Sequence, residues 1–262
     1  MSSRSVTSFK NSEALASGVA RALVQTISRM QRNRPTASDD GLVRLVLTGG
    51  TVGIKTLRQL LVLDHSARAS AEDFPVAAID WNRVLVFFGD ERFLPAGDEE
   101  RNDVQARAAL LDHIEIPRSN IFTYATVQEG QAADGESLDK AADSYAHVLQ
   151  REAPEGFDIH LLGMGPEGHV NSLFPHTEEL MDPQGTVAAV RNCPKPPSNR
   201  VSLTRLAVNS SRQVWFIING EAKKEAAQHA LAADSSGQWP AGMMEGTEET
   251  ILWVDAEADP QS

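Results

Sequence analysis

The apolar positions of this chain follow two spacings, one typical of helices and the other of buried strands. Between Leu15 and Met30 apolar residues recur every three or four positions, which predicts an amphipathic helix that ends before Pro35. The short continuous apolar runs at 84–88 and 214–218 predict buried strands. By the same criteria, helices are also expected around 54–61, 104–111, 138–149 and 221–231, and strands at 42–47, 159–162, 187–190, 201–206 and 251–254.

The alternation of these strands and helices predicts the fold class. Repeated strand–helix units favour an α/β fold with an open, doubly wound, mainly parallel sheet of the Rossmann-like kind and helices on both faces. After Pro175 the apolar runs shorten, which predicts a small strand-rich insertion near 186–206. No break in composition divides the chain, so residues 1–262 are expected to form a single domain, with about 180–212 as a candidate strand-rich subdomain.

Composition narrows the class of protein. A chain of 262 residues with 41% hydrophobic content can bury one large core. No apolar run approaches the ~20 residues of a membrane helix, and the first residues lack a secretory signal, so a cytoplasmic protein is expected. The single cysteine, Cys193, agrees with a reducing compartment. The net charge of −12 disfavours a nucleic-acid or membrane partner, so any small anionic ligand requires a local cluster of basic groups.

The candidate chemistry lies in loops that follow three predicted strands, at 48–53, 89–95 and 163–169. The carboxyl ends of parallel strands meet at one edge, where open α/β sheets bind ligands. A glycine loop before a helix presents backbone N–H groups and the positive helix end to an anion. With the imidazole of His169 and the ammonium of Lys195, these loops supply groups suited to hydrolysing or isomerising a phosphorylated small molecule.

Several motifs, in this order along the chain, resemble the 6-phosphogluconolactonase family. They are Leu47–Thr51, Phe88–Pro95, Asn102, Ile116–Ile121, Gly163–His169, Ser172–Pro175, and Pro194–Pro197 with Arg200. The resemblance runs from about Leu42 to near Leu231, and the glycine-histidine motif is its most specific part. Two positions depart from the family pattern: Glu167 stands where the family usually has Asp, and the first loop lacks the proline commonly found there.

The resemblance implies hydrolysis of 6-phospho-D-glucono-1,5-lactone, the second step of the oxidative pentose phosphate pathway, without a metal or organic cofactor. His169 is then expected to activate water and return a proton to the ring oxygen, with Glu167 supporting the imidazole. The phosphate is expected against the first loop, with Arg92, Lys195 and Arg200 converging on the substrate as charged donors, some to the phosphate and others to the lactone oxygens. The substrate-binding residues that the resemblance implies are Gly49, Gly50, Thr51, Asp90, Glu91, Arg92, Asn102, Lys195 and Arg200.

Residue spacing also argues against a bound metal ion and a bound dinucleotide. The seven histidines show no His-x-x-x-His spacing, and one cysteine cannot form a thiolate cluster, so no metal is expected. The spacing Gly163-x-Gly165-x-x-Gly168 matches the dinucleotide fingerprint. Pro166 and His169 stand where that motif should open a helix, so we set it aside.

Two other functions stay open as alternatives. An aminosugar-6-phosphate isomerase or deaminase is similar in fold, but its glycine-histidine loop continues with a run like Ala-Phe-Asn-Glu-Pro, where this chain has Asn171–Pro175. A non-catalytic sugar-phosphate sensor usually carries a DNA-binding helix-turn-helix, and the sequence predicts only one helix before the first strand. The expected partner is therefore a small sugar-phosphate lactone, bound by a monomer, with a weak dimer as the alternative.

Overall fold

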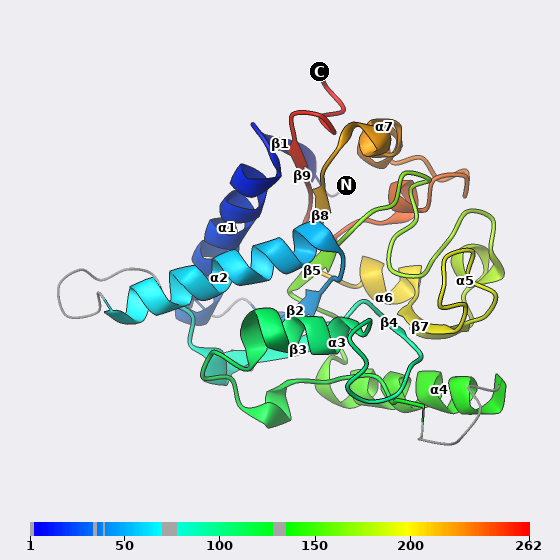
Figure 1. Cartoon of the computed structure of the whole chain (residues 1–262), viewed down its shortest axis with the longest axis horizontal. Helices are drawn as coiled ribbons and strands as arrows, with labels where there is room; N and C mark the ends of the chain where they lie inside the picture. The colour runs from blue at the N-terminus through cyan, green and yellow to red at the C-terminus, as the bar shows by residue number, and fades with distance from the viewer. Residues whose placement is uncertain (1–2, 34–35, 39, 70–77, 128–134) are drawn as a thin grey trace.

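The computed structural model describes residues 3–33, 36–38, 40–69, 78–127 and 135–262 (Figure 1). Six strands form a sheet in the order β1-β9-β8-β5-β2-β3, and every neighbouring pair is parallel. The strands are β1 (Ser3–Phe9), β2 (Val43–Leu47), β3 (Val84–Phe88), β5 (Ile159–Leu162), β8 (Gln213–Ile218) and β9 (Glu249–Asp255). The mainly parallel α/β sheet expected from the sequence is thereby confirmed.

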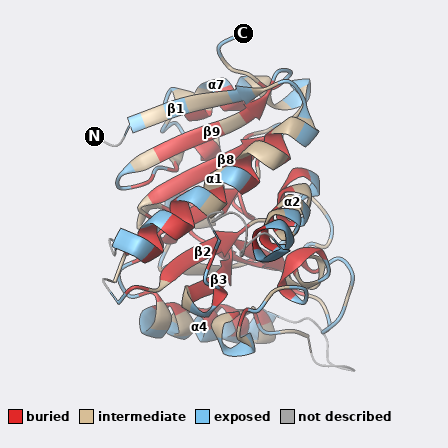
Figure 2. Cartoon of the chain, turned by 90° about the vertical axis from the view of Figure 1, so that its left-hand side faces the viewer, coloured by how far each residue is buried: buried red, intermediate tan, exposed pale blue. Residues whose placement is uncertain are grey.

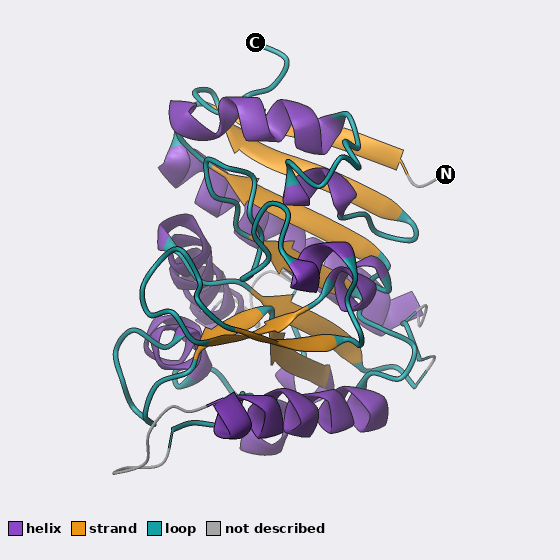
Figure 3. Cartoon of the chain, turned by 90° about the vertical axis from the view of Figure 1, so that its right-hand side faces the viewer, coloured by secondary structure: helices purple, strands orange, loops and turns teal. Residues whose placement is uncertain are grey.

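Helices cover both faces of this sheet. They are α1 (Ser12–Asn33), α2 (Thr51–Ala69), α3 (Asn102–Ala106), α4 (Gly135–Glu152), α5 (Glu178–Met181), α6 (Arg205–Asn209) and α7 (Lys224–Leu231). Figure 2 shows α1 and α2 crossing one face, and Figure 3 shows the opposite side, where α7 lies. Side chains of β8 alternate between the two layers: Trp215 belongs to the apolar cluster with α1, and Phe216 to the cluster with α7. In the described ranges, no helix is long and apolar enough to cross a membrane.

A small antiparallel sheet, in the order β4-β7-β6, lies beside the large one. Its strands are β4 (Asp90–Arg92), β7 (Arg200–Leu203) and β6 (Val187–Val190). This sheet confirms the strand-rich insertion predicted near 186–206. The sequence did not predict β4, because three charged residues carry no apolar pattern; its pairing sets Arg92 opposite Arg200.

Several predicted boundaries were wrong. The run 201–206 is a strand only to Leu203, because Thr204 caps the start of α6, where the Val208 N–H donates to the Thr204 carbonyl. The helix predicted around 104–111 consists of α3 and a π-helical turn, Arg107–Leu111, and the helix predicted at 221–231 begins with a 3₁₀ turn, Glu221–Lys223.

The N-terminal strand β1 was missed altogether. Its sequence is rich in Ser, Thr and Arg because β1 forms the edge of the sheet and pairs with β9 alone. The sequence also predicts acidic loops at Asp64–Phe74 and Gln128–Gly135. The first part of the former, up to Ala69, belongs to α2, while 70–77 and 128–134 lie outside the described residues.

The buried His160 of β5 should make the stability of the fold depend on pH. Its Nε2 has no partner among the described residues, and burial lowers the pKa of His160 to about 3, from 6.5 for an unfolded chain. The unfolded chain therefore takes up a proton that the folded chain excludes, so stability is full above pH 6.5 and falls as the pH drops toward 3.

We expect His160→Leu to flatten this dependence. Between about pH 7 and pH 5, the wild type should lose ~2 kcal/mol more unfolding free energy than the variant, measured by urea denaturation. The exposed His147 gives the control, because His147→Gln should keep the wild-type slope. Equal slopes in wild type and His160→Leu would contradict the assignment.

Candidate active site

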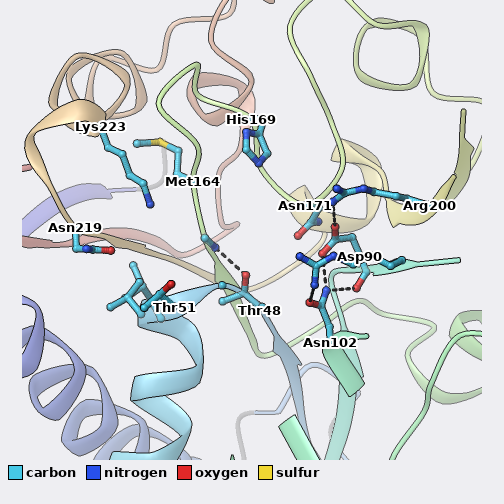
Figure 4. A pocket seen from close by; sticks show the side chains of 16 residues that line it. Thr48, Thr51, Asp90, Asn102, Met164, His169, Asn171, Arg200, Asn219 and Lys223 are labelled. Atoms are coloured by element: carbon cyan, nitrogen blue, oxygen red, sulfur yellow. Dashed lines mark hydrogen bonds and ion pairs between the residues drawn. The ribbon is translucent and has the colours of Figure 1, made fainter. Parts of the chain in front are cut away.

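A cavity of about 390 Å³ opens at the carboxyl ends of β2, β5 and β8 (Figure 4). Thr48, Gly163 and Asn219 directly follow these three strands. The Gly163 N–H donates to Thr48 Oγ1 at 2.9 Å, which ties two of the loops together. The lining residues are Thr48, Gly49, Gly50, Thr51, Val52, Asp90, Arg92, Asn102, Gly163, Met164, His169, Asn171, Arg200, Ile217, Asn219 and Lys223.

The glycine loop forms one end of this cavity. Gly50 adopts a φ of +81°, which turns the chain sharply from β2 into α2. The helix begins at Thr51, three residues before the apolar residue that marked it in the sequence. The first N–H groups of a helix have no acceptor within it, so the start of the 19-residue α2 provides amides and a positive helix end for an anion.

Asp90 organises the opposite wall. Ser172 Oγ donates to Asp90 Oδ2 at 2.7 Å, Asn102 Nδ2 donates to Oδ1 at 3.1 Å, and Arg200 Nη1 lies 3.8 Å from Oδ2. Arg92 Nη1 donates in turn to Asn102 Oδ1 at 2.7 Å. The Asn102 carboxamide also packs onto Gly49, where a Cβ would overlap its oxygen. These contacts connect the glycine loop to the charged wall.

Glu91 points the other way and is absent from the cavity lining. Its carboxylate accepts the backbone N–H groups of Arg92, Asn102 and Asp103 at 2.7–3.0 Å, with Arg101 3.8 Å away. Burial raises the pKa of Glu91 to about 7. Glu91 therefore fixes the start of α3, and the structure does not bring it together with the other residues predicted to bind substrate.

His169 is held by a carboxylate and an ammonium. Its Nδ1 lies 3.1 Å from Glu167 Oε1 and 3.4 Å from Lys195 Nζ, while Lys195 Nζ lies 2.8 Å from the same Glu167 oxygen. The ring stacks on Phe174 with 4.6 Å between centroids. Because Nδ1 lies closer to the Glu167 oxygen than to the Lys195 ammonium, we assign the proton to Nδ1, where it is donated to the carboxylate, and this leaves Nε2 as the acceptor. Gly165 is required here, since a Cβ would overlap the imidazole.

The electrostatics keep this imidazole neutral. Burial lowers the pKa of His169 and the Lys195 ammonium lowers it further, whereas the Glu167 carboxylate partly opposes both. For Glu167, burial acts to raise the pKa, but the hydrogen bond from Lys195 and nearby charges outweigh it, so the pKa is lowered. At neutral pH the pair is thus a Glu167 carboxylate beside a neutral imidazole, which carries its one ring proton on Nδ1.

The three cations predicted as charged donors to the substrate lie in different places. Lys195 contacts Glu167 and is not in the lining. Arg200 lines the cavity, and it also donates to the carbonyls of Lys195, Pro196 and Pro197 at 2.9–3.2 Å. Arg200 therefore supports the loop that carries Lys195, while Arg92 is connected to the glycine loop through Asn102.

Sequence reasoning missed lining residues on the β8 side of the cavity, above all Lys223. A signal was present, because the buried strand 214–218 ends in a polar turn and Lys223 lies in the first turn of the helix predicted at 221–231, the same strand–loop–helix arrangement as in the first loop. Asn171 was also missed as a site residue. Among the described residues, no three His, Cys, Asp or Glu side chains group as a metal site, and the absence of a metal stays a prediction.

A parallel α/β sheet with a histidine and a helix N-terminus at its carboxyl edge defines a class of proteins that bind small anionic ligands there. The sequence model of the family described as glucosamine-6-phosphate isomerases/6-phosphogluconolactonase matches residues 10–253. The chain belongs to this family, which confirms the resemblance seen in its motifs.

Within the family, the chain is similar to proteins named 6-phosphogluconolactonase. It is 40% identical to that of Mycobacterium leprae over 261 residues, which cover 98% of this chain and 97% of the relative. It is 36% identical to that of Streptomyces coelicolor, over 96% and 92% of the two chains. The structure of 6-phosphogluconolactonase from Trypanosoma brucei shares the fold, with a TM-score of 0.78 at 22% identity over 98% of each chain. A monomeric glucosamine-6-phosphate deaminase shares it as well, with a TM-score of 0.73 at 21% identity over 97% of this chain and 98% of the other.

Proposed function

We propose that this protein hydrolyses 6-phospho-D-glucono-1,5-lactone to 6-phospho-D-gluconate, the second step of the oxidative pentose phosphate pathway. The observation that carries the proposal is the neutral His169, held by Glu167 on the wall of a cavity that also contains the N-terminus of α2 and Lys223. The names of the relatives at 36–40% identity support the same reaction.

The proposed chemistry requires one group that takes and returns a proton. His169 Nε2 accepts a proton from water as the water oxygen bonds to the lactone carbonyl carbon. The carbonyl oxygen becomes an oxyanion, for which Arg200 supplies a buried positive charge in the lining. When the bond from that carbon to the ring oxygen breaks, the imidazolium returns the proton to the leaving oxygen. Glu167 stabilises the imidazolium formed in between.

The two ends of the substrate are assigned by charge. We place the phosphate at the N-terminus of α2, between Arg92 and Lys223, because the helix provides free amides and both cations line the cavity. The lactone carbonyl then lies below His169, beside Asp90 and Arg200 (Figure 4). The reaction as written uses no metal or organic cofactor.

A stopped-flow assay with freshly generated phosphogluconolactone tests the proposal. We expect acid release well above spontaneous hydrolysis, and no release of ammonia from glucosamine 6-phosphate. Ammonia release without lactone hydrolysis would favour the deaminase branch of the family instead. Failure to accelerate lactone hydrolysis would contradict the proposal.

The Glu167 carboxylate should set the acid limb of the pH profile. Because its charge raises the pKa of His169, Glu167→Gln should move the acid limb of kcat/KM to lower pH, and should lower kcat at least ~10-fold through a poorly oriented imidazole. Glu167→Asp keeps the charge and should retain most activity. An unchanged acid limb in Glu167→Gln would show that the charge has no influence on His169.

The cellular setting belongs to the same proposal. We infer a cytoplasmic monomer whose partner is the small lactone alone, without nucleic acid or membrane. The net charge of −12 supports the last part, since an acidic surface repels polyanions.

A further inference from the structure

Asn171 carries a polar group for which the described residues provide no partner. It lies two residues after His169 and lines the same cavity, with only 9% of the residue exposed. Neither Nδ2 nor Oδ1 of its carboxamide has a hydrogen-bond partner among the described residues. Buried amides in folded proteins are paired with few exceptions, so an unpaired one on a cavity wall indicates a group reserved for a ligand.

The surroundings fix the backbone at Asn171 and leave room for its carboxamide. Asn171 has a φ of +48°, a conformation that costs energy for any residue except glycine and that Asn tolerates better than most. Gly89 makes room for the amide, because a Cβ there would overlap Asn171 Oδ1. The next residue, Ser172, is anchored through Oγ to Asp90 and through its N–H to Ser202 Oγ. The loop is thus rigid at the point where the unpaired amide occurs.

We propose that Asn171 binds the hydroxyl on the carbon next to the lactone carbonyl and so selects phosphorylated aldonolactones that carry a free 2-hydroxyl. A hydroxyl donates and accepts, which matches the acceptor and donors of a carboxamide. The amide packs against Gly89, so it contacts substrate by rotating toward the cavity that it already lines.

The position of Asn171 points to this hydroxyl rather than to the phosphate. Asn171 shares the loop of His169, where the reacting carbonyl must lie, whereas Lys223 and Thr51 lie across the cavity (Figure 4). This inference rests on the proposed function, since it takes His169 as the group beside the reacting carbon.

The test compares 6-phosphogluconolactone with its 2-deoxy analogue in wild type and Asn171→Gly. Glycine removes the carboxamide and accepts the positive φ without strain, so folding should survive. We expect the wild type to prefer the parent lactone by roughly 10- to 100-fold in kcat/KM, and Asn171→Gly to reduce this preference to within about 3-fold. A preference that persists in Asn171→Gly would overturn the inference.

Asn192→Gly provides a matched control. Asn192 has a φ of +54° and is exposed, so the same substitution there should leave the 2-hydroxyl preference unchanged. Calorimetric binding of 6-phosphogluconate and its 2-deoxy form separates this inference from the proposed function, because binding needs no turnover. If neither lactone is hydrolysed but the wild type still prefers the parent acid and Asn171→Gly does not, the role of Asn171 stands and the reaction is wrong. Equal binding of the two acids by the wild type would overturn the inference.

Discussion

His169→Ala and His169→Asn are expected to lower kcat by about 10²–10⁴-fold, because each removes the group that takes a proton from water and returns it to the ring oxygen. The loss should remain incomplete, since the cations and amides of the cavity still bind and orient the lactone. The acid limb of kcat, which reports the imidazole, should disappear as well. Stopped-flow turnover and circular dichroism on the same samples test these expectations together.

His176 provides the control for this experiment. It follows His169 by seven residues, contacts Gln238 rather than the cavity, and has a φ of +59° that Asn accommodates. His176→Asn should therefore turn over like the wild type. Wild-type turnover in His169→Ala with an unchanged fold would reassign His169 to structure, where its stacking on Phe174 would be its main contribution.

The sequence predicted most of the large sheet because its central strands are buried on both faces. The central strand β2, Val43–Leu47, for example, has no exposed face and is apolar at every position except Arg44. The edge strand β1 and the three-residue β4 lack this signal. The glycine-histidine motif was also predictable, because its glycines are needed for local reasons. A Cβ at Gly165 would overlap the His169 imidazole, and Gly168 has a φ of +78°, which favours glycine.

The assignment of individual side chains could not be predicted in the same way. Alternation along β4 turns Asp90 to the cavity and Glu91 to the start of α3, but that alternation becomes visible only once the strand is known. Similarly, the sequence left open which of the three cations contacts the phosphate, and the structure separates them: Lys195 pairs with Glu167, and Arg200 donates to carbonyls of the proline-rich loop. Lys223 replaces Lys195 at the phosphate end in our proposal because it lines the cavity.

Lys223→Ala is expected to have the largest effect on recognition of the phosphate. A charged donor to a phosphate dianion contributes ~1.5–3 kcal/mol, which corresponds to roughly a 10- to 150-fold rise in KM. Burial lowers the pKa of Lys223 and Lys195 lowers it further, so a bound dianion should restore the charged form and raise that pKa. Arg92→Ala should act in the same direction.

The readout is the ratio of kcat/KM for phosphorylated and unphosphorylated gluconolactone. In Lys223→Ala this ratio should fall by the same factor, roughly 10- to 150-fold. Turnover of the unphosphorylated lactone should change little. Lys224→Ala is the matched control, because the neighbouring ammonium points to the C-terminus and donates to the Ser262 carbonyl at 2.8 Å. Added salt should weaken 6-phosphogluconate binding to the wild type more than to Lys223→Ala, since exposed charges are screened over about 10 Å at 0.1 M. An unchanged ratio in both Lys223→Ala and Arg92→Ala would mean that the phosphate does not bind at the N-terminus of α2, because both cations of that end would have been removed without consequence.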